Sequence, residues 1–258
     1  FQKISNKITW TQLKNRFGNA NPPAVKLIDM MVEMKKTEDF NSYLSIELKE
    51  AIQSCMNKNE QIILMQNRRG YAVVQQCLSC GDIASCNHCS VSLTYHRKGE
   101  KLICHYCDFK SKIDLICSNC GQDDLHFLGS GTQKVEEELQ FIFPTAKILR
   151  MDKDTVRNKN GHHAILDKFE KGQADILLGT QMIAKGLDFP NVTLVGVINA
   201  DTGVFMPDFR AGERNFQLIY QVVGRSGRHQ KPGNAIIQTF NPNEMSISTA
   251  AHQNLKQF

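Results

Sequence analysis

The sequence predicts an α/β fold in which helices cover both faces of a parallel sheet and a small metal-binding domain is inserted into the chain. Short apolar segments alternate with amphipathic segments along most of the sequence, which is the pattern of strands joined by crossover helices. In addition, eight of the nine cysteines fall in four Cys-x-x-Cys pairs between residues 77 and 120.

Composition is compatible with this prediction and excludes two other classes of protein. The chain has 258 residues, of which 41% are hydrophobic, enough for a substantial core in one or two domains. The mean hydropathy is −0.34, and no apolar run approaches the roughly 18 residues of a membrane helix. An integral membrane protein and a mostly disordered chain are therefore excluded. The net charge of +5 permits nucleic-acid binding without arguing for it.

The expected elements follow in order along the chain. Strands are expected at residues 25–30, 61–66, 125–128, 146–151, 174–178, 192–198 and 235–240, and helices at 45–57, 132–143, 161–171 and 213–224. The strands are short apolar runs, whereas the helices repeat apolar residues every three or four positions. The helix at 132–143 also has three glutamates in its first turns, which suits the helix dipole. Cys55 lies on the apolar side of the helix at 45–57 and is expected in the core.

The chain is expected to divide into three parts. Residues 1–22 are polar and irregular and are expected to be the tail of a preceding region. Residues 23–76 and 121–258 together build the sheet, and residues 77–120 form the inserted domain. Because the chain starts at Phe1 rather than Met, we expect it to be a fragment.

The four cysteine pairs predict two structural zinc sites. The pairs are Cys77/Cys80, Cys86/Cys89, Cys104/Cys107 and Cys117/Cys120. Each pair can share a tetrahedral ion, and eight thiolates fill two sites with no position left for water. Disulfides or a redox motif are the alternatives, but four regular pairs without other secretory features favour metal in a reducing compartment. About 44 residues cannot bury a sufficient core, so metal binding has to supply the folding free energy.

The pairing of these cysteines follows from a predicted hairpin. Residues 90–103 alternate around a polar turn at Lys98 and Gly99. This hairpin brings the two inner pairs together, and its closure also brings the outer pairs together. We therefore expect nested pairing, with one inner and one outer zinc ion. His88 and His105 could replace a thiolate, although with eight cysteines we expect them to be exposed loop residues.

Ligands of parallel sheets gather at the carboxyl ends of strands, and we consider three motifs for such positions. The first follows the strand at 174–178 and runs from Gly179 and Thr180 to Gly186 and Asp188. A hydroxyl and bare backbone amides at the end of a strand can hold a phosphate. When this motif is considered alone, an ordinary loop without a ligand is the simpler interpretation.

The second motif carries Gln221, Arg225 and Arg228. A helix would place these three side chains within roughly 60° of one another, at about 100° per residue. Guanidinium groups suit phosphate oxygens and the charge of a phosphoryl-transfer transition state. A solvated basic face is the commoner role of two arginines, but Gly224 and Gly227 have poor helix propensity and need another reason to be there.

The third motif places Arg68, Arg69 and Tyr71 directly after the strand at 61–66. Two cations and an aromatic ring can grip a nucleic-acid backbone and a base. A solvated turn is an equally good interpretation of this composition.

Taken together, the motifs resemble a known family. In chain order they are Asn67-Arg-Arg-Gly-Tyr71, the four cysteine pairs, Gly129-Ser-Gly-Thr-Gln133, Gly179-Thr-Gln-Met-Ile-Ala-Lys-Gly186, Pro207-Asp-Phe-Arg-Ala-Gly-Glu-Arg214 and Gln221-Val-Val-Gly-Arg-Ser-Gly-Arg228. Over nearly its whole length the chain is similar to the PriA family of primosomal replication-restart helicases. The glycine-rich motifs by themselves indicate only a superfamily-2 helicase, and the cysteine block ahead of them narrows the resemblance to PriA.

The resemblance implies the second RecA-like motor lobe of a bacterial ATP-dependent 3′–5′ DNA helicase. Thr180 and Gln181 would contact the DNA backbone, and Lys185 is counted with the DNA-binding candidates. Gly186 and Asp188 would lie near the nucleotide. Gln221, Arg225 and Arg228 would face the γ-phosphate, with Arg228 as the arginine finger and Arg225 as a supporting contact. The resemblance also supports the nested zinc pairing.

The same resemblance implies cofactors and partners. ATP and Mg²⁺ would bind together with a first motor lobe of the same parent chain. The DNA would be single-stranded, forked or a D-loop, at sites where replication restarts through primosome assembly. The zinc domain would take part in unwinding and in contacts with primosome proteins, and single-stranded-DNA-binding protein is a further expected partner. The expected location is the bacterial cytoplasm, with no membrane association.

Half of the nucleotide site is absent from this sequence. There is no Gly-x-x-x-x-Gly-Lys-Ser/Thr loop for the phosphates and no Asp-Glu-x-His box for magnesium. We therefore expect the isolated chain to hydrolyse essentially no ATP. One alternative is a zinc-dependent nucleic-acid or protein docking module on a catalytically degenerate RecA-like lobe. Another is a different helicase family with an independent zinc insert.

Overall fold

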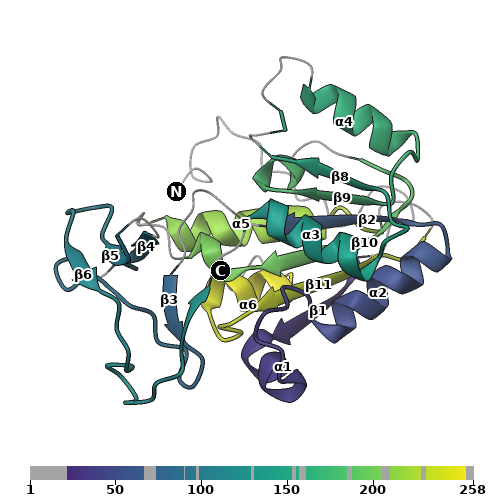
Figure 1. Ribbon diagram of the computed structural model, residues 1–258. Helices are drawn as coiled ribbons and strands as arrows, with labels where there is room; N and C mark the ends of the chain where they lie inside the picture. The colour runs from purple at the N-terminus through teal and green to yellow at the C-terminus, as the bar shows by residue number, and fades with distance from the viewer. Residues whose placement is uncertain are drawn as a thin grey trace, which may run out of the picture.

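The predicted parallel sheet is present. The computed structural model describes residues 22–66, 74–89, 91–96, 99–128, 131–152, 155–156, 161–184, 188–204, 210–227 and 231–253. Within these ranges, six strands form a sheet in the order β1-β11-β10-β2-β9-β8 (Figure 1). Their bounds are β1 Ala24–Asp29, β2 Gln61–Gln66, β8 Ile148–Met151, β9 Ile176–Gly179, β10 Val192–Asn199 and β11 Asn234–Thr239. Every neighbouring pair in this sheet is parallel, which confirms the predicted α/β class.

Helices connect these strands, and the four predicted helices are present to within about two residues. The helices in the described ranges are α1 Met30–Thr37, α2 Ile46–Asn57, α3 Thr132–Ile142, α4 Gly161–Glu170, α5 Ala211–Val223 and α6 Met245–Ala251, with short 3-10 turns η2 Gln181–Ala184 and η3 Asp201–Gly203. Helix α1 was not predicted, because it follows β1 with no intervening loop and its apolar residues continue those of the strand. The Asp29 side chain marks its start by accepting hydrogen bonds from the first turn. Nowhere in the described ranges is there a helix with the length and apolarity to cross a membrane.

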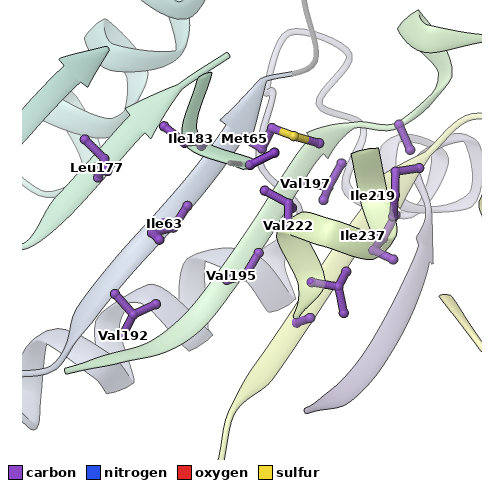
Figure 2. Close-up of a cluster of buried hydrophobic side chains, with 14 of the residues drawn as sticks. Ile63, Met65, Leu177, Ile183, Val192, Val195, Val197, Ile219, Val222 and Ile237 are labelled. Carbon is purple, nitrogen blue, oxygen red and sulfur yellow. The ribbon is translucent and has the colours of Figure 1, made fainter. Parts of the chain in front are cut away.

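The sheet is buried on both faces, and alternate residues of each central strand enter different cores. In β2, Ile63 and Met65 face one core, whereas Ile62 and Leu64 face the other. Side chains of α4, α5 and α6 pack in the first core, and those of α2 and α3 pack in the second. Figure 2 shows Ile219 and Val222 of α5 against the strand residues of the first core. Cys55 lies in the second core, as predicted.

The cysteine-rich segment projects from the sheet as a separate arm (Figure 1). Its base is an antiparallel ribbon of β3 (Val74–Cys77) and β7 (Leu125–Leu128). Its outer part is a three-stranded antiparallel sheet of β4 (Thr94–His96), β5 (Lys101–Ile103) and β6 (Lys110–Lys112). The predicted hairpin is therefore present as β4 and β5. The strand predicted at 125–128 also exists, but it pairs with β3 rather than joining the parallel sheet.

Candidate functional site

The eight paired cysteines form two clusters in the nested arrangement. Cys77, Cys80, Cys117 and Cys120 form the outer cluster, and Cys86, Cys89, Cys104 and Cys107 form the inner cluster; within each, the sulfur atoms lie within 4.8 Å of one another. The distances Cys77–Cys120, Cys80–Cys117 and Cys86–Cys107 are each 3.6 Å between Sγ atoms. A tetrahedral zinc ion with Zn–S bonds of about 2.3 Å requires S···S edges of about 3.8 Å. The donor set and its spacing therefore fit two structural zinc ions.

Backbone hydrogen bonds shape each cysteine turn. In the outer cluster, the amide nitrogens of Gly81 and Gly121 donate to the carbonyl oxygens of Cys77 and Cys117 at 2.8 and 2.9 Å. Both glycines have positive φ values, of 80° and 73°, a conformation that glycine adopts without steric cost. In the inner cluster, Asp108 occupies the equivalent position with a φ of 58°.

Hydrogen-bond donors and neighbouring thiols move the pKa values of these cysteines in opposite directions. The backbone amide of Asp82 and the side-chain amide of Asn119 lower the pKa of Cys80 to about 7. The Cys107 thiol, together with burial, raises the pKa of Cys89 to about 12. Ionising a second thiol beside the first is unfavourable, and a divalent cation is what allows four adjacent thiols to ionise together.

The two histidines within the cysteine turns lie outside both clusters. His88 and His105 are exposed. The Nε2 atom of His105 lies 3.1 Å from that of His96 at the end of β4, and the ring of His88 contacts that of Phe109 with centroids 5.0 Å apart.

The first ligand motif lies at the carboxyl end of β9. Thr180 and Gln181 directly follow the strand and are half-buried, and η2 folds back over the strand end. A Cβ atom added to Gly179 would lie 2.6 Å from Ile183 Cγ2 and 2.8 Å from the Met151 carbonyl oxygen. Glycine is therefore required here because the end of the neighbouring strand β8 and the returning turn η2 both approach its α-carbon. Asp188, further along the motif, is exposed.

The arginine motif departs from its predicted geometry. Helix α5 ends at Val223, and Gly224 caps it, so Arg225 lies in a turn beyond the helix rather than on a helical face with Gln221. The poor helix propensity of glycine explains this end. The motif also leads into the amino end of β11, not to the carboxyl edge of the sheet, because α5 runs back across it. We call residues 224–228 the arginine segment.

A side-chain hydrogen bond joins the arginine segment to the first motif. The Nη2 atom of Arg225 donates to the carbonyl oxygen of Ala184, the last residue of η2, at 2.6 Å. Forty-one residues separate the two partners in the sequence. Gln221 is exposed on the last turn of α5. The side chain of Arg225 thus connects the two glycine-rich motifs.

Two further polar groups hold the loops at the carboxyl edge of the sheet. From the sequence, Asp152 is expected either to line the motor cleft or to form a charged turn, whereas nothing in the pattern singles out Asp201. Asp152, after β8, accepts a hydrogen bond from Thr132 Oγ1 at the start of α3, at 2.6 Å. Asp201, after β10, accepts from Thr239 Oγ1 and from the backbone amide of Phe240, each at 2.8 Å. Burial raises the pKa of Asp201 to about 6 in spite of these donors. The only sequence signal for Asp201 is its position as an aspartate shortly after a strand.

Several candidate residues lie outside the described part of the chain. They are Arg68, Arg69 and Tyr71 after β2, Lys185 and Gly186 after η2, and Arg228 at the end of the arginine segment. Their roles stay predictions.

Two models of known protein families match parts of this chain. Residues 86–112 match the model described as the PriA DNA helicase Cys-rich region domain. Residues 107–230 match the helicase conserved C-terminal domain. The replication restart protein PriA of Bacillus subtilis is 47% identical over 246 residues, which is 95% of this chain and 30% of that protein. This chain belongs to the PriA family. The PriA protein of Chlamydia trachomatis is 43% identical over 257 residues, covering 99% of this chain and 34% of its own length.

The chain thus spans about a third of the length of these PriA relatives. The part shared with PriA contains the helicase C-terminal lobe and the cysteine-rich region with its two structural zinc sites. A solved structure of S. cerevisiae Dbp5 bound to RNA and ADP BeF3 is 13% identical, with a TM-score of 0.41, and covers 82% of this chain and 37% of the Dbp5 chain. With this identity and TM-score, the comparison supports no conclusion about the fold of this chain.

Proposed function

We propose that this chain is the second motor lobe of an ATP-dependent 3′–5′ DNA helicase that recognises stalled forks and D-loops and restarts replication. The observation that carries the proposal is the hydrogen bond from Arg225 to Ala184, because it couples the arginine segment to the turn η2, which follows Thr180 and begins with Gln181. In a motor, the element that faces the nucleotide and the element that contacts DNA have to move together. Membership of the PriA family supports the same function.

Each candidate residue has a proposed role in this motor. ATP, bound with Mg²⁺ by a first lobe of the same parent chain, would supply the phosphoryl group whose hydrolysis drives movement along DNA. Arg225 is held by Ala184 and suits a supporting contact, whereas Arg228 would place its guanidinium on the γ-phosphate as the arginine finger. Gln221 would face the same phosphate, and Gly186 and Asp188 would lie beside the nucleotide.

The proposed DNA contacts lie on the adjoining loops. Thr180 and Gln181 at the end of β9 would bind phosphate oxygens of single-stranded DNA, together with Lys185. Arg68, Arg69 and Tyr71 would bind the backbone and a base. The six are candidate residues, of which Thr180 and Gln181 lie in the described ranges.

The test uses the full-length parent helicase and compares Arg228→Ala with wild type. Fork-stimulated ATP hydrolysis should fall on the order of 10³-fold or more, because an arginine finger stabilises transition-state charge. DNA binding measured in the same samples should stay within about twofold. Lys171→Ala removes an exposed cation after α4 and serves as the control. Persistent hydrolysis with weaker DNA binding and a reduced salt slope would instead indicate a docking module.

We also propose that the arm formed by residues 74–128, which includes the predicted insert at 77–120, docks primosome proteins or single-stranded-DNA-binding protein in the bacterial cytoplasm. Leu115 and Ile116 support this role, because they are 81% and 61% exposed and exposed apolar groups are typical of docking surfaces. Replacing both by serine should weaken co-purification of these partners at least tenfold. Phe141→Ser, at an 88% exposed position on α3, is the control, and equal loss in both variants would contradict the proposal.

A further inference from the structure

Gly233, the residue before β11, lies directly against the backbone of the arginine segment. A Cβ atom at this position would lie 2.3 Å from the Gly227 nitrogen, 2.5 Å from the Ser226 carbonyl carbon and 2.6 Å from Gly227 Cα. Real Cβ atoms essentially never approach other heavy atoms this closely. All three neighbours belong to the main chain, so no side-chain rotation can make room. Any side chain at residue 233 would force one of two backbone segments to move.

The strand side of this contact is strongly held. The Gly233 carbonyl oxygen accepts a hydrogen bond from the Ala24 amide nitrogen at 2.9 Å. Asn234, the next residue, begins β11 and lies in register with Ala24 on β1 and Leu194 on β10. Moving Gly233 away would therefore disturb a strand that is paired on both sides.

The turn side belongs to no strand and is held by hydrogen bonds to the end of α5 and by the Arg225 side chain. The Arg225 amide nitrogen donates to the Val222 carbonyl oxygen at 2.9 Å, and that of Ser226 donates to Val223 at a longer 3.4 Å. Gly227 has a φ of 68°, in the left-handed region that favours glycine. Because β11 is paired with a strand on each side and residues 224–227 lie in a turn, we expect the turn to move when space is taken at residue 233.

We infer that Gly233 is a positioning residue for the arginine segment: its missing side chain lets the Ser226–Gly227 backbone rest against the start of β11. This contact sets the place of Arg225, whose guanidinium reaches Ala184. Gly233 has this positioning role whether or not the chain takes part in ATP hydrolysis. Its catalytic consequence rests on the proposed function, in which the same segment faces the γ-phosphate.

The test compares Gly233→Ala with Gly212→Ala. Gly212 lies in α5, and a Cβ there would meet nothing closer than Ser246 Cβ at 3.9 Å, so this variant should leave the segment in place. In the zinc-loaded chain, Gly233→Ala should speed amide hydrogen exchange at Arg225 and Ser226 at least tenfold. Exchange at Ile236 and Ile237 in β11 should change by less than about threefold, because local opening is confined to the turn.

The second readout is ATP hydrolysis by the full-length parent carrying the same substitutions, well below its melting temperature. Gly233→Ala should lower kcat on the order of 10²-fold, since displacing a catalytic group by about 1 Å has effects of this size. KM for ATP and DNA affinity should stay within about twofold. A purely structural role would lower the melting temperature but leave kcat of the folded protein unchanged.

Faster exchange in β11 and β1, or a chain whose sheet no longer forms, would overturn the inference, because the strand would then have moved instead of the turn. Unchanged exchange at Arg225 and Ser226 would overturn it as well. If Arg228→Ala leaves hydrolysis intact, the proposed function fails, while the exchange comparison still decides the role of Gly233.

Discussion

Arg225 donates a hydrogen bond from Nη2 to the main-chain carbonyl oxygen of Ala184 at 2.6 Å, and so fastens the turn after α5 to the turn after β9. The donor is charged and half-buried, and such bonds contribute more than neutral ones. The hydrogen bond is a structural link in this chain, whatever the guanidinium does when nucleotide is bound.

Removing this link should lower stability. Arg225→Ala in the zinc-loaded chain is expected to reduce the free energy of unfolding by about 2 kcal/mol, the size of a hydrogen bond to a charged group. Arg225→Lys should recover little, because an ammonium group lacks the planar fork. Urea denaturation provides the measurement. Lys171→Ala should stay within about 0.5 kcal/mol of wild type, and an Arg225→Ala variant equally close would show that the bond contributes nothing.

Loss of one inner cysteine should affect one zinc site only. Cys104→Ser is expected to lower the zinc content from two ions to about one per chain and to unfold β4–β6, because metal binding supplies the folding free energy there. The parallel sheet should survive, since its two cores contain none of the paired cysteines. Metal analysis and hydrogen exchange test both statements. Cys55→Ser, at a core cysteine outside the clusters, should retain both ions. Undiminished zinc in Cys104→Ser, or collapse of the whole chain, would count against the prediction.

Replacing Asp108 of the inner cysteine turn by glycine should increase zinc affinity. Asp108 has a φ of 58°, which costs a non-glycine residue roughly 1 kcal/mol. Asp108→Gly is therefore expected to tighten zinc binding by up to about fivefold in a chelator competition. Gly121→Ala, at the equivalent outer position with a φ of 73°, should weaken binding by a similar factor. Equal affinities in all three proteins would show that the turn conformation is not limiting.

Asp201 should make stability depend on pH in the direction opposite to that of a salt-bridged aspartate. Its pKa is raised to about 6 by burial from an ordinary value of 3.8, so the folded state binds the proton more tightly than the unfolded state. The stability that it contributes therefore grows as pH falls through 6 and is lost as pH rises.

The matched variant is Asp201→Asn, which removes the titration. The unfolding free energy of wild type minus that of the variant should be larger at pH 5 than at pH 7 by roughly 1 kcal/mol. Because both proteins carry the same zinc sites, acid effects on the metal cancel in this difference. Parallel profiles over that range would refute the role assigned to Asp201.

Much of the fold could be predicted because its signals are local. The apolar run at 61–66 coincides with β2, and the amphipathic pattern at 132–143 with α3. The segment 125–128 shows where local reasoning ends, since its residues favour a strand but do not say which partner it joins. In the structure it pairs with β3 and supports the arm. Similarly, periodicity placed Arg225 and Gln221 on one helical face, whereas Gly224 ends the helix between them.

The sequence by itself determined the α/β class, the four cysteine pairs and the position of the glycine-rich motifs, because periodicity, spacing and residue chemistry are written in neighbouring residues. Only the tertiary structure decided that Arg225 reaches Ala184 and that Gly233 lies against Gly227. It also decided that Asp201 is buried and accepts a hydrogen bond from Thr239. These relationships join residues far apart in the chain. They depend on how closely separate segments approach one another, and that distance is set by the packing of the whole sheet with its helices.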